Sequence, residues 1–303
     1  MSETKPRLNR VTLFLIILPL WLFGSAGGAL WYYFHREKKD AEIEQKRFVQ
    51  AVSTPLIEDD LKKIVEVIGE RNASSETAAA NLSRMAAMIE GLLGPSNTGY
   101  AVKQNRGPAK WPLLQVTIRG TKPENPAVWV LTSYDSRAGS KGAEANATGL
   151  AATLAAAQAL AHDKPVAPVH FVFLPHVNDI ESPVLETASK FLELSKPAGA
   201  PRAILCVEAM GSGEALWLTS RDTEAAPLPL VSGLGEVYGA EVVCLGEDSD
   251  LASTLFEMDL PAVRVATRAT LTAEDEDERL PFAPTVAASA GRLVELIRRS
   301  SAK

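Results

Sequence analysis

Two hydrophobic periods alternate along residues 56–303, and this alternation constrains the fold more than any other feature. Apolar residues at helical spacing predict helices at 55–69 and 74–94, and Gly69 and Gly94 are placed to end them. After residue 99, short apolar runs predict strands, with further helix-like segments between them. Strands that alternate with helices predict an α/β domain in three layers, with a mostly parallel central sheet and helices on both faces.

The expected elements after residue 99 follow from these patterns. The strands are expected at 100–105, 113–120, 127–133, 168–175, 202–210, 215–220, 240–246 and 262–267. The helices are expected at 148–162, 184–195, 228–239, 250–259 and 285–300.

The amino-terminal part contains an apolar run, residues 11–34, without a charged side chain. At about 1.5 Å per residue, such a run is long enough to cross a hydrocarbon core of ~30 Å. A cleaved signal peptide is the alternative, but its apolar core has only about 7–15 residues. We therefore expect a tail at 1–10, a transmembrane helix at 11–34, a helical connector at 35–55 and the α/β domain at 56–303.

Basic residues lie on both sides of the run, so the charge rule hardly distinguishes the two orientations. We expect a single-pass membrane protein whose α/β domain lies outside the cytoplasm, in the periplasm if the source is bacterial.

Composition excludes some function classes. The net charge is −6 and no basic stripe is present, which argues against nucleic-acid binding. The two cysteines, Cys206 and Cys244, form no disulfide framework and match no zinc-knuckle spacing. We interpret them as core thiols, with a single disulfide as the alternative if the domain is extracytoplasmic.

Acidic side chains follow several of the expected strands. In a parallel sheet, ligands bind beyond the carboxyl ends of the strands, so these side chains are expected to meet at one edge. They are Asp135, Glu144, Asp179, Glu181, Glu208, Asp222, Glu247, Asp248 and Asp250, together with His176.

The order of segments resembles the di-zinc aminopeptidase family, which also includes the glutaminyl cyclases. The segments that carry the resemblance are "TSYDSRAG", "GAEANATGLAA", "FVFLPHVNDIES", "AILCVEAMGSG", "EDSDLASTLFEMDLPAVRV" and "PFAPTVAASAGRLVELI". The resemblance covers nearly everything after residue 55 and implies the zinc-exopeptidase fold.

The resemblance also implies where metal ligands belong. The family's first histidine ligand falls on Ser133, its bridging aspartate on Ala145, and its last histidine ligand on Leu251. Its Glu-Glu pair, the general base and a ligand, falls on Val177 and Asn178.

At two of the matched positions this chain still carries an acidic residue. Glu208 stands where the family has an aspartate ligand, and Asp135 matches the aspartate that orients the first histidine. Gly142, Asn146 and Gly149 retain the pattern of the loop around Ala145.

These departures favour a catalytically degenerate, membrane-anchored module that binds or scaffolds a peptide or protein partner and needs no cofactor. A catalytic zinc site uses about three N, O or S ligands and an open position for water, and this donor set does not supply them. A purely architectural role is a further interpretation.

The alternative is an active zinc-dependent aminopeptidase-type hydrolase, or an aminoacyl- or glutaminyl-transfer enzyme, with a relocated site. Its candidate residues are Asp135, His176, Asp179 and Glu181. The plainer interpretation of His176 is a solvated loop side chain, and that of the acids is a solvated rim or a helix cap.

Overall fold

The computed structural model describes residues 52–178, 184–213, 215–220, 240–242, 251–268 and 278–302, with eight positions between 18 and 35. The chain divides into two compact units, Met1–Val49 and Gln50–Lys303, and the fold below is that of the second unit. Within the described parts of the chain, we find no helix with the length and apolar character that a membrane crossing requires. The predicted span at 11–34 lies mostly outside the described residues, and the predicted helix at 228–239 lies wholly outside them.

A single mixed sheet forms the centre of the second unit. Its eight described strands have the order β1-β2-β4-β3-β5-β8-β6-β7. Their bounds are β1 Lys103–Arg106, β2 Pro112–Ile118, β3 Val128–Ser133, β4 Val169–Leu174, β5 Ala203–Val207, β6 Trp217–Ser220, β7 Ala240–Val242 and β8 Ala262–Ala266.

The central strands β4, β3, β5 and β8 are parallel to one another, as the alternation of strands and helices predicts. The edges differ, because β1 pairs antiparallel with β2, β2 with β4, and β6 with β8. The prediction of a mostly parallel sheet therefore holds for the centre, and the sheet as a whole is mixed.

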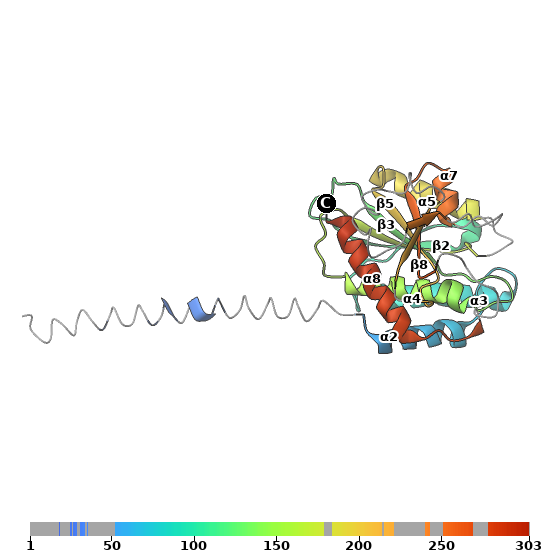
Figure 1. Cartoon of the computed structure of the whole chain (residues 1–303), viewed down its shortest axis with the longest axis horizontal. Helices are drawn as coiled ribbons and strands as arrows, with labels where there is room; N and C mark the ends of the chain where they lie inside the picture. Colours follow the sequence, from blue (N-terminus) through green and yellow to red (C-terminus); the bar gives the residue numbers. More distant parts are fainter. Residues whose placement is uncertain are drawn as a thin grey trace, which may run out of the picture. The chain divides into compact units, whose positions relative to one another are not determined.

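Helices cover both faces of the sheet (Figure 1). One face carries α2 Thr54–Lys62, η1 Lys63–Ile68, α3 Glu76–Leu93, α4 Thr148–Ala159 and α8 Ala283–Ser301, which share a large apolar core with the sheet. The other face carries α5 Val184–Ser195 and α7 Leu251–Glu257 over a smaller apolar core. Short helical turns are η2 Pro108–Lys110, η3 Ala143–Ala147 and η4 Lys196–Ala198. The three-layer α/β architecture is confirmed.

Local sequence explains the bounds of α3, the longest helix on the amino-terminal side of this unit. The Ser75 side chain accepts a hydrogen bond from the Ala78 N–H at 3.1 Å, so one amide of the first turn is satisfied. The buried stripe along α3 includes Leu82, Met85 and Ile89, which supply the apolar face expected from the sequence.

The last turn of α8 is tied to the loop that leads into β4. The Ser301 carbonyl accepts hydrogen bonds from the N–H groups of Val166 and Ala167, at 3.1 and 2.9 Å. Both amides are thereby satisfied by a helix that packs along α4 on the same face of the sheet.

Cys206 lies on β5 in the smaller core, which agrees with its interpretation as a core thiol. Cys244 lies outside the described residues, so the question of a pair stays open.

Candidate functional site

The carboxyl ends of β4, β3, β5 and β8 meet at one edge of the sheet, because these four strands are parallel neighbours. Ser133 ends β3, residues 175–178 follow β4, Glu208 follows β5, and Thr267 follows β8. The predicted rim thus exists for the described residues. The other acids predicted at this rim lie outside the described residues: Asp179, Glu181, Asp222, Glu247, Asp248 and Asp250.

Asp135 organises the loop that follows β4. Its carboxylate is fully buried, and its Oδ2 accepts the N–H groups of Val177 at 3.0 Å and Asn178 at 2.8 Å. Burial raises the pKa of the Asp135 carboxyl above its usual value, and these two hydrogen bonds oppose the shift. The interpretation of Asp135 as a solvated rim acid is therefore wrong, because its side chain holds loop amides inside the protein.

Ser133 is held by two amide side chains. Asn178 Nδ2 donates to Ser133 Oγ at 2.9 Å, and Asn146 Nδ2 donates to the same oxygen and, at 3.0 Å, to the Ser133 carbonyl. A serine hydroxyl has two lone pairs, so these two donors engage its acceptor capacity.

Asn146 in turn accepts a hydrogen bond from Arg71 Nη2. Arg71 is fully buried between the loop after η1 and the rim, where it also donates to the carbonyls of Tyr134, Gly69 and Lys141. This arginine was missed by the sequence analysis, since it lies in the loop "GERNASS" with no motif around it.

Ala145 sits on η3, next to the segment that follows β5. Its carbonyl accepts the Ala209 N–H at 3.4 Å. The close approach needs Gly149, because a Cβ there would lie 3.0 Å from Glu208 Cα and 3.1 Å from the Val207 carbonyl oxygen. The glycine that the family resemblance places at position 149 thus has a physical role in backbone packing.

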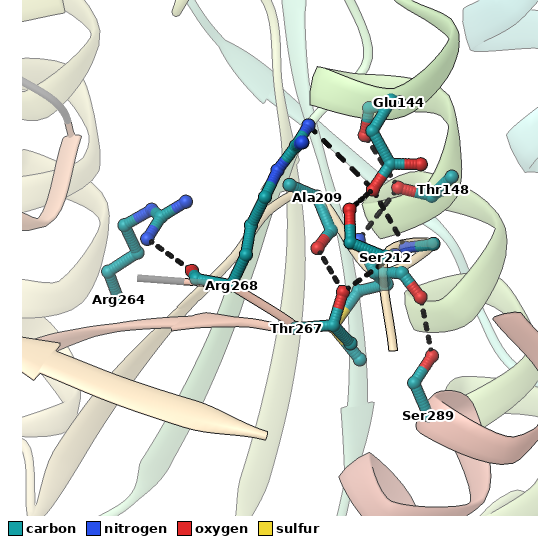
Figure 2. Close-up of polar contacts among 10 residues, drawn as sticks. Glu144, Thr148, Ala209, Ser212, Arg264, Thr267, Arg268 and Ser289 are labelled. Atoms are coloured by element: carbon teal, nitrogen blue, oxygen red, sulfur yellow. Dashed lines mark hydrogen bonds and ion pairs between the residues drawn. The ribbon is translucent and has the colours of Figure 1, made fainter. Parts of the chain in front are cut away.

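Glu208 forms an ion pair with an arginine from β8. Arg264 Nε lies 3.0 Å from Glu208 Oε2, with 1% and 15% of the two side chains exposed. Arg264 also donates to the Arg268 carbonyl at 3.2 Å (Figure 2). A charged residue inside the apolar run "AVRVA" was the available sequence signal, because a buried charge is nearly always paired.

Glu144 precedes Ala145 and points to the segment after β5 (Figure 2). Its Oε1 accepts the Gly211 N–H at 3.1 Å and the Ser212 hydroxyl at 2.7 Å. Arg268 Nη2 approaches the same oxygen at 3.9 Å. This carboxylate is thus occupied by groups of the protein itself.

His176 differs from its sequence interpretation. It is fully buried and not solvated, with a backbone φ of 51°. Its ring lies edge-on to Trp111, with 6.2 Å between ring centroids, and its carbonyl accepts the Thr187 hydroxyl at 2.9 Å. The next two amides of the loop, those of Val177 and Asn178, are bound by Asp135.

The remaining two family-equivalent positions are apolar and serve packing. Leu251, at the start of α7, is 2% exposed and belongs to the smaller core with Cys206. Val177 packs against that same core from the loop after β4.

These contacts test whether the six positions fit a pair of zinc ions. Ala145, Val177 and Leu251 offer no donor atom. Ser133 already accepts two hydrogen bonds, and Glu208 faces a guanidinium. These side chains do not fit the three or more N, O or S ligands that a catalytic zinc needs. Among the described residues, no group of three or more His, Cys, Asp or Glu side chains is placed to hold a metal ion.

A cavity of about 220 Å³ lies away from this rim, near the carboxyl end of α8. Its lining includes Ile118, Leu160 and Ile297, with the Asp163–Arg298 ion pair beside them. None of the predicted site residues lines it.

The fold and the rim together define a three-layer α/β domain, and part of this domain matches a known family model. Residues 114–241 match Peptidase family M28, which confirms the resemblance to zinc aminopeptidases and glutaminyl cyclases. A sequence comparison with curated proteins gives no match.

Solved structures agree with this class in fold. The Legionella pneumophila LapA aminopeptidase is similar with a TM-score of 0.66 and 14% identity, over 86% of this chain and 74% of that chain. BSAP, a zinc aminopeptidase from Bacillus subtilis, gives 0.62 and 8% over 83% and 96%. The Porphyromonas gingivalis glutaminyl cyclase gives 0.56 and 12% over 82% and 98%.

Proposed function

We propose that residues 56–303 form a non-catalytic binding or scaffolding module on an aminopeptidase-type fold, without a di-zinc site. The strongest support comes from the side chains at the six positions where the family has its metal ligands and general base. Three of the six family-equivalent side chains are hydrocarbon, and the Ser133 hydroxyl is bound by the amides of Asn146 and Asn178.

The chemistry of zinc hydrolysis explains why this donor set matters. A zinc ion lowers the pKa of its bound water to about 7, and a carboxylate base then removes the proton. Val177 and Asn178 stand where the family has that base and a ligand, and neither side chain accepts a proton at neutral pH. Loss of the metal or of the base alone lowers the rate by orders of magnitude.

Membrane attachment is the second part of the proposal. The uncharged run at 11–34 is long enough to cross a bilayer, and we place the α/β domain outside the cytoplasm. The module then presents the rim of its sheet to a peptide or protein partner on that side of the membrane.

The experiment measures metal content and turnover on the same purified full-length protein in detergent. Elemental analysis counts zinc per chain. Aminoacyl-arylamide hydrolysis has BSAP as its positive control, and glutaminyl-peptide cyclisation has the Porphyromonas gingivalis glutaminyl cyclase. We expect no stoichiometric zinc and no turnover above the detergent blank, even after added zinc. Stoichiometric zinc with turnover contradicts the proposal and supports the alternative, an enzyme with a relocated site whose candidate residues are Asp135, His176, Asp179 and Glu181.

A second arm tests the binding module. Trileucine, its N-acetyl form and its C-amide form are added while the thermal unfolding midpoint is recorded. If the rim binds one end of a peptide, we expect a saturable rise of the midpoint with only one of the two blocked peptides, because the acetyl and amide groups block opposite ends. No shift with any of the three peptides contradicts binding at the rim and leaves the architectural interpretation.

A further inference from the structure

Glu208 and Arg264 are neighbours by the geometry of the sheet. β5 and β8 are parallel, and Cys206 lies opposite Arg264 in their register. Glu208 is two residues beyond Cys206 and therefore points to the same face as Arg264. The Glu208 N–H continues the ladder by donating to the Val265 carbonyl at 3.0 Å.

The Arg264 side chain is almost closed to water, and the Glu208 side chain is mostly buried. Arg264 is 1% exposed and donates from Nε to Glu208 Oε2 at 3.0 Å. Removing a guanidinium from water is costly, so a buried arginine requires a charged or polar partner of this kind. The hydrogen bond from Nη1 to the Arg268 carbonyl fixes the orientation of the guanidinium (Figure 2).

Glu208 is also the position at which the resemblance places a metal ligand with a carboxylate. A zinc ion binds a carboxylate oxygen at about 2.0–2.2 Å. A second cation beside the guanidinium would meet a like charge in a poorly solvated site. The Glu208 carboxylate can therefore bind either the Arg264 guanidinium or a metal ion, but not both.

The neighbouring acid repeats the arrangement. Glu144, one residue before Ala145, has the Arg268 guanidinium at 3.9 Å and two hydrogen-bond donors on the same oxygen. Two carboxylates around the expected metal positions thus face arginines from β8 and from the segment that follows it.

We propose that Arg264 is the resident cation of this site: its guanidinium neutralises Glu208 in the place of a metal ion. The inference rests on the proposed absence of the di-zinc site and adds how the fold compensates for it. The folded domain then needs no metal for stability, and Glu208 does not attract a divalent cation while Arg264 is present.

The test compares Arg264→Met, Glu208→Gln and the double variant in the full-length protein, with Arg298→Met as a matched control. Arg298 also pairs with an acid, Asp163, but lies away from the rim. The probes are Zn²⁺ and Mn²⁺, and the readouts are the thermal midpoint and cation affinity by calorimetry. Arg264→Lys, which keeps the charge, is measured in parallel.

We expect the wild type, Arg264→Lys and Arg298→Met to show no midpoint shift with either cation or with EDTA. Arg264→Met is expected to unfold at a lower temperature and to gain saturable cation binding at least about tenfold tighter than wild type. The double variant is expected to lose that binding and to be less destabilised than the sum of the single variants.

Two outcomes overturn the inference. One is additive destabilisation in the double variant, and the other is cation binding by Arg264→Met no tighter than by wild type. If Arg264→Met does not fold, Arg264→Lys provides the test. A cation affinity of Arg264→Lys about tenfold higher than that of the wild type then overturns the inference as well. All of these leave the proposed function standing, whereas stoichiometric zinc with turnover in the wild type removes both.

Discussion

The Asn178 side chain donates a hydrogen bond to Ser133 Oγ at 2.9 Å, so the residues at two positions where the family has metal ligands bind each other. The same amide lies 3.3 Å from Asp135 Oδ1 and ties the loop after β4 to the end of β3. We therefore expect Asn178→Ala to lower the free energy of unfolding by about 1–2 kcal/mol, because Ser133 and Asp135 both lose a donor. Denaturant unfolding of the full-length protein measures this loss.

The control for that variant is Asn97→Ala, which removes an exposed amide bonded to the Gly91 carbonyl at 2.7 Å. It is expected to cost less than about 1 kcal/mol, since water replaces the lost bond. An Asn178→Ala variant as stable as this control would show that the link from Ser133 to Asp135 has no structural weight.

Gly149 permits the close approach of α4 to the end of β5. A methyl group there would lie 3.0 Å from Glu208 Cα, a backbone atom that cannot move aside easily. We expect Gly149→Ala to destabilise the domain by about 1–3 kcal/mol through overpacking. Thermal unfolding checks it against Gly91→Ala on α3, where the added methyl meets nothing within 4 Å.

Gly91→Ala is expected to raise stability by up to about 1 kcal/mol, because alanine favours the helix. Equal effects of the two alanine substitutions would contradict the close packing at Gly149.

Arg71 connects the loop after η1 to the rim through the carbonyls of Tyr134, Gly69 and Lys141 and through Asn146. We expect Arg71→Met to lower stability by about 3 kcal/mol or more, since several buried acceptors lose their donor. Arg71→Lys is expected to recover only part of this, because an ammonium lacks the planar fork of donors.

The matched control is Arg84→Met on α3, whose guanidinium donates to Asn81 Oδ1 at 3.1 Å. Chemical denaturation of the three variants gives the comparison. A lysine at position 71 as stable as the wild type would count against the role of the fork geometry.

Asp60 on α2 provides a pH dependence with a defined sign. Its side chain is 5% exposed, and burial raises its pKa from 3.8 to about 6, with opposition from Lys63 and a small rise from Asp59. The native state therefore binds the proton more tightly than the unfolded chain. Its contribution to stability decreases as the pH rises from about 4 to about 6, and the full cost of about 2–3 kcal/mol is present at pH 7.

We expect Asp60→Asn to remove this decrease, so the difference between variant and wild type grows from pH 4 to pH 7. Unfolding free energies at several pH values measure it. Asp59→Asn serves as control and is expected to retain the decrease, because Asp60 remains. A constant difference between Asp60→Asn and wild type over this range would refute the pKa shift as its cause.

Much of the fold was predictable because local patterns determine it. The apolar runs that become β3, β4 and β5 are buried on both faces, as continuous hydrophobic strands in a parallel sheet must be. The capping serine and apolar stripe of α3 likewise act within a few residues. The direction of β2 and β6 was not predictable, because antiparallel pairing with β4 and β8 is decided by contacts far along the chain.

In the candidate site too, some features could be predicted from the sequence and others could not. The rim could be predicted from strand ends, since parallel strands finish at one edge. The burial of His176 could not be predicted, because its ring packs against Trp111, a residue far away along the chain. The burial of Arg264 could have been predicted, because a charged residue stands within an apolar strand. Nothing in the sequence around Arg71 indicates its burial.

The hydrogen bonds from Val166 and Ala167 to the Ser301 carbonyl have a practical meaning for protein engineering. They connect the final turn of α8 to the loop that leads into β4. Any affinity tag is therefore best appended after this turn, because removal of the turn would leave the N–H groups of Val166 and Ala167 without their shared acceptor.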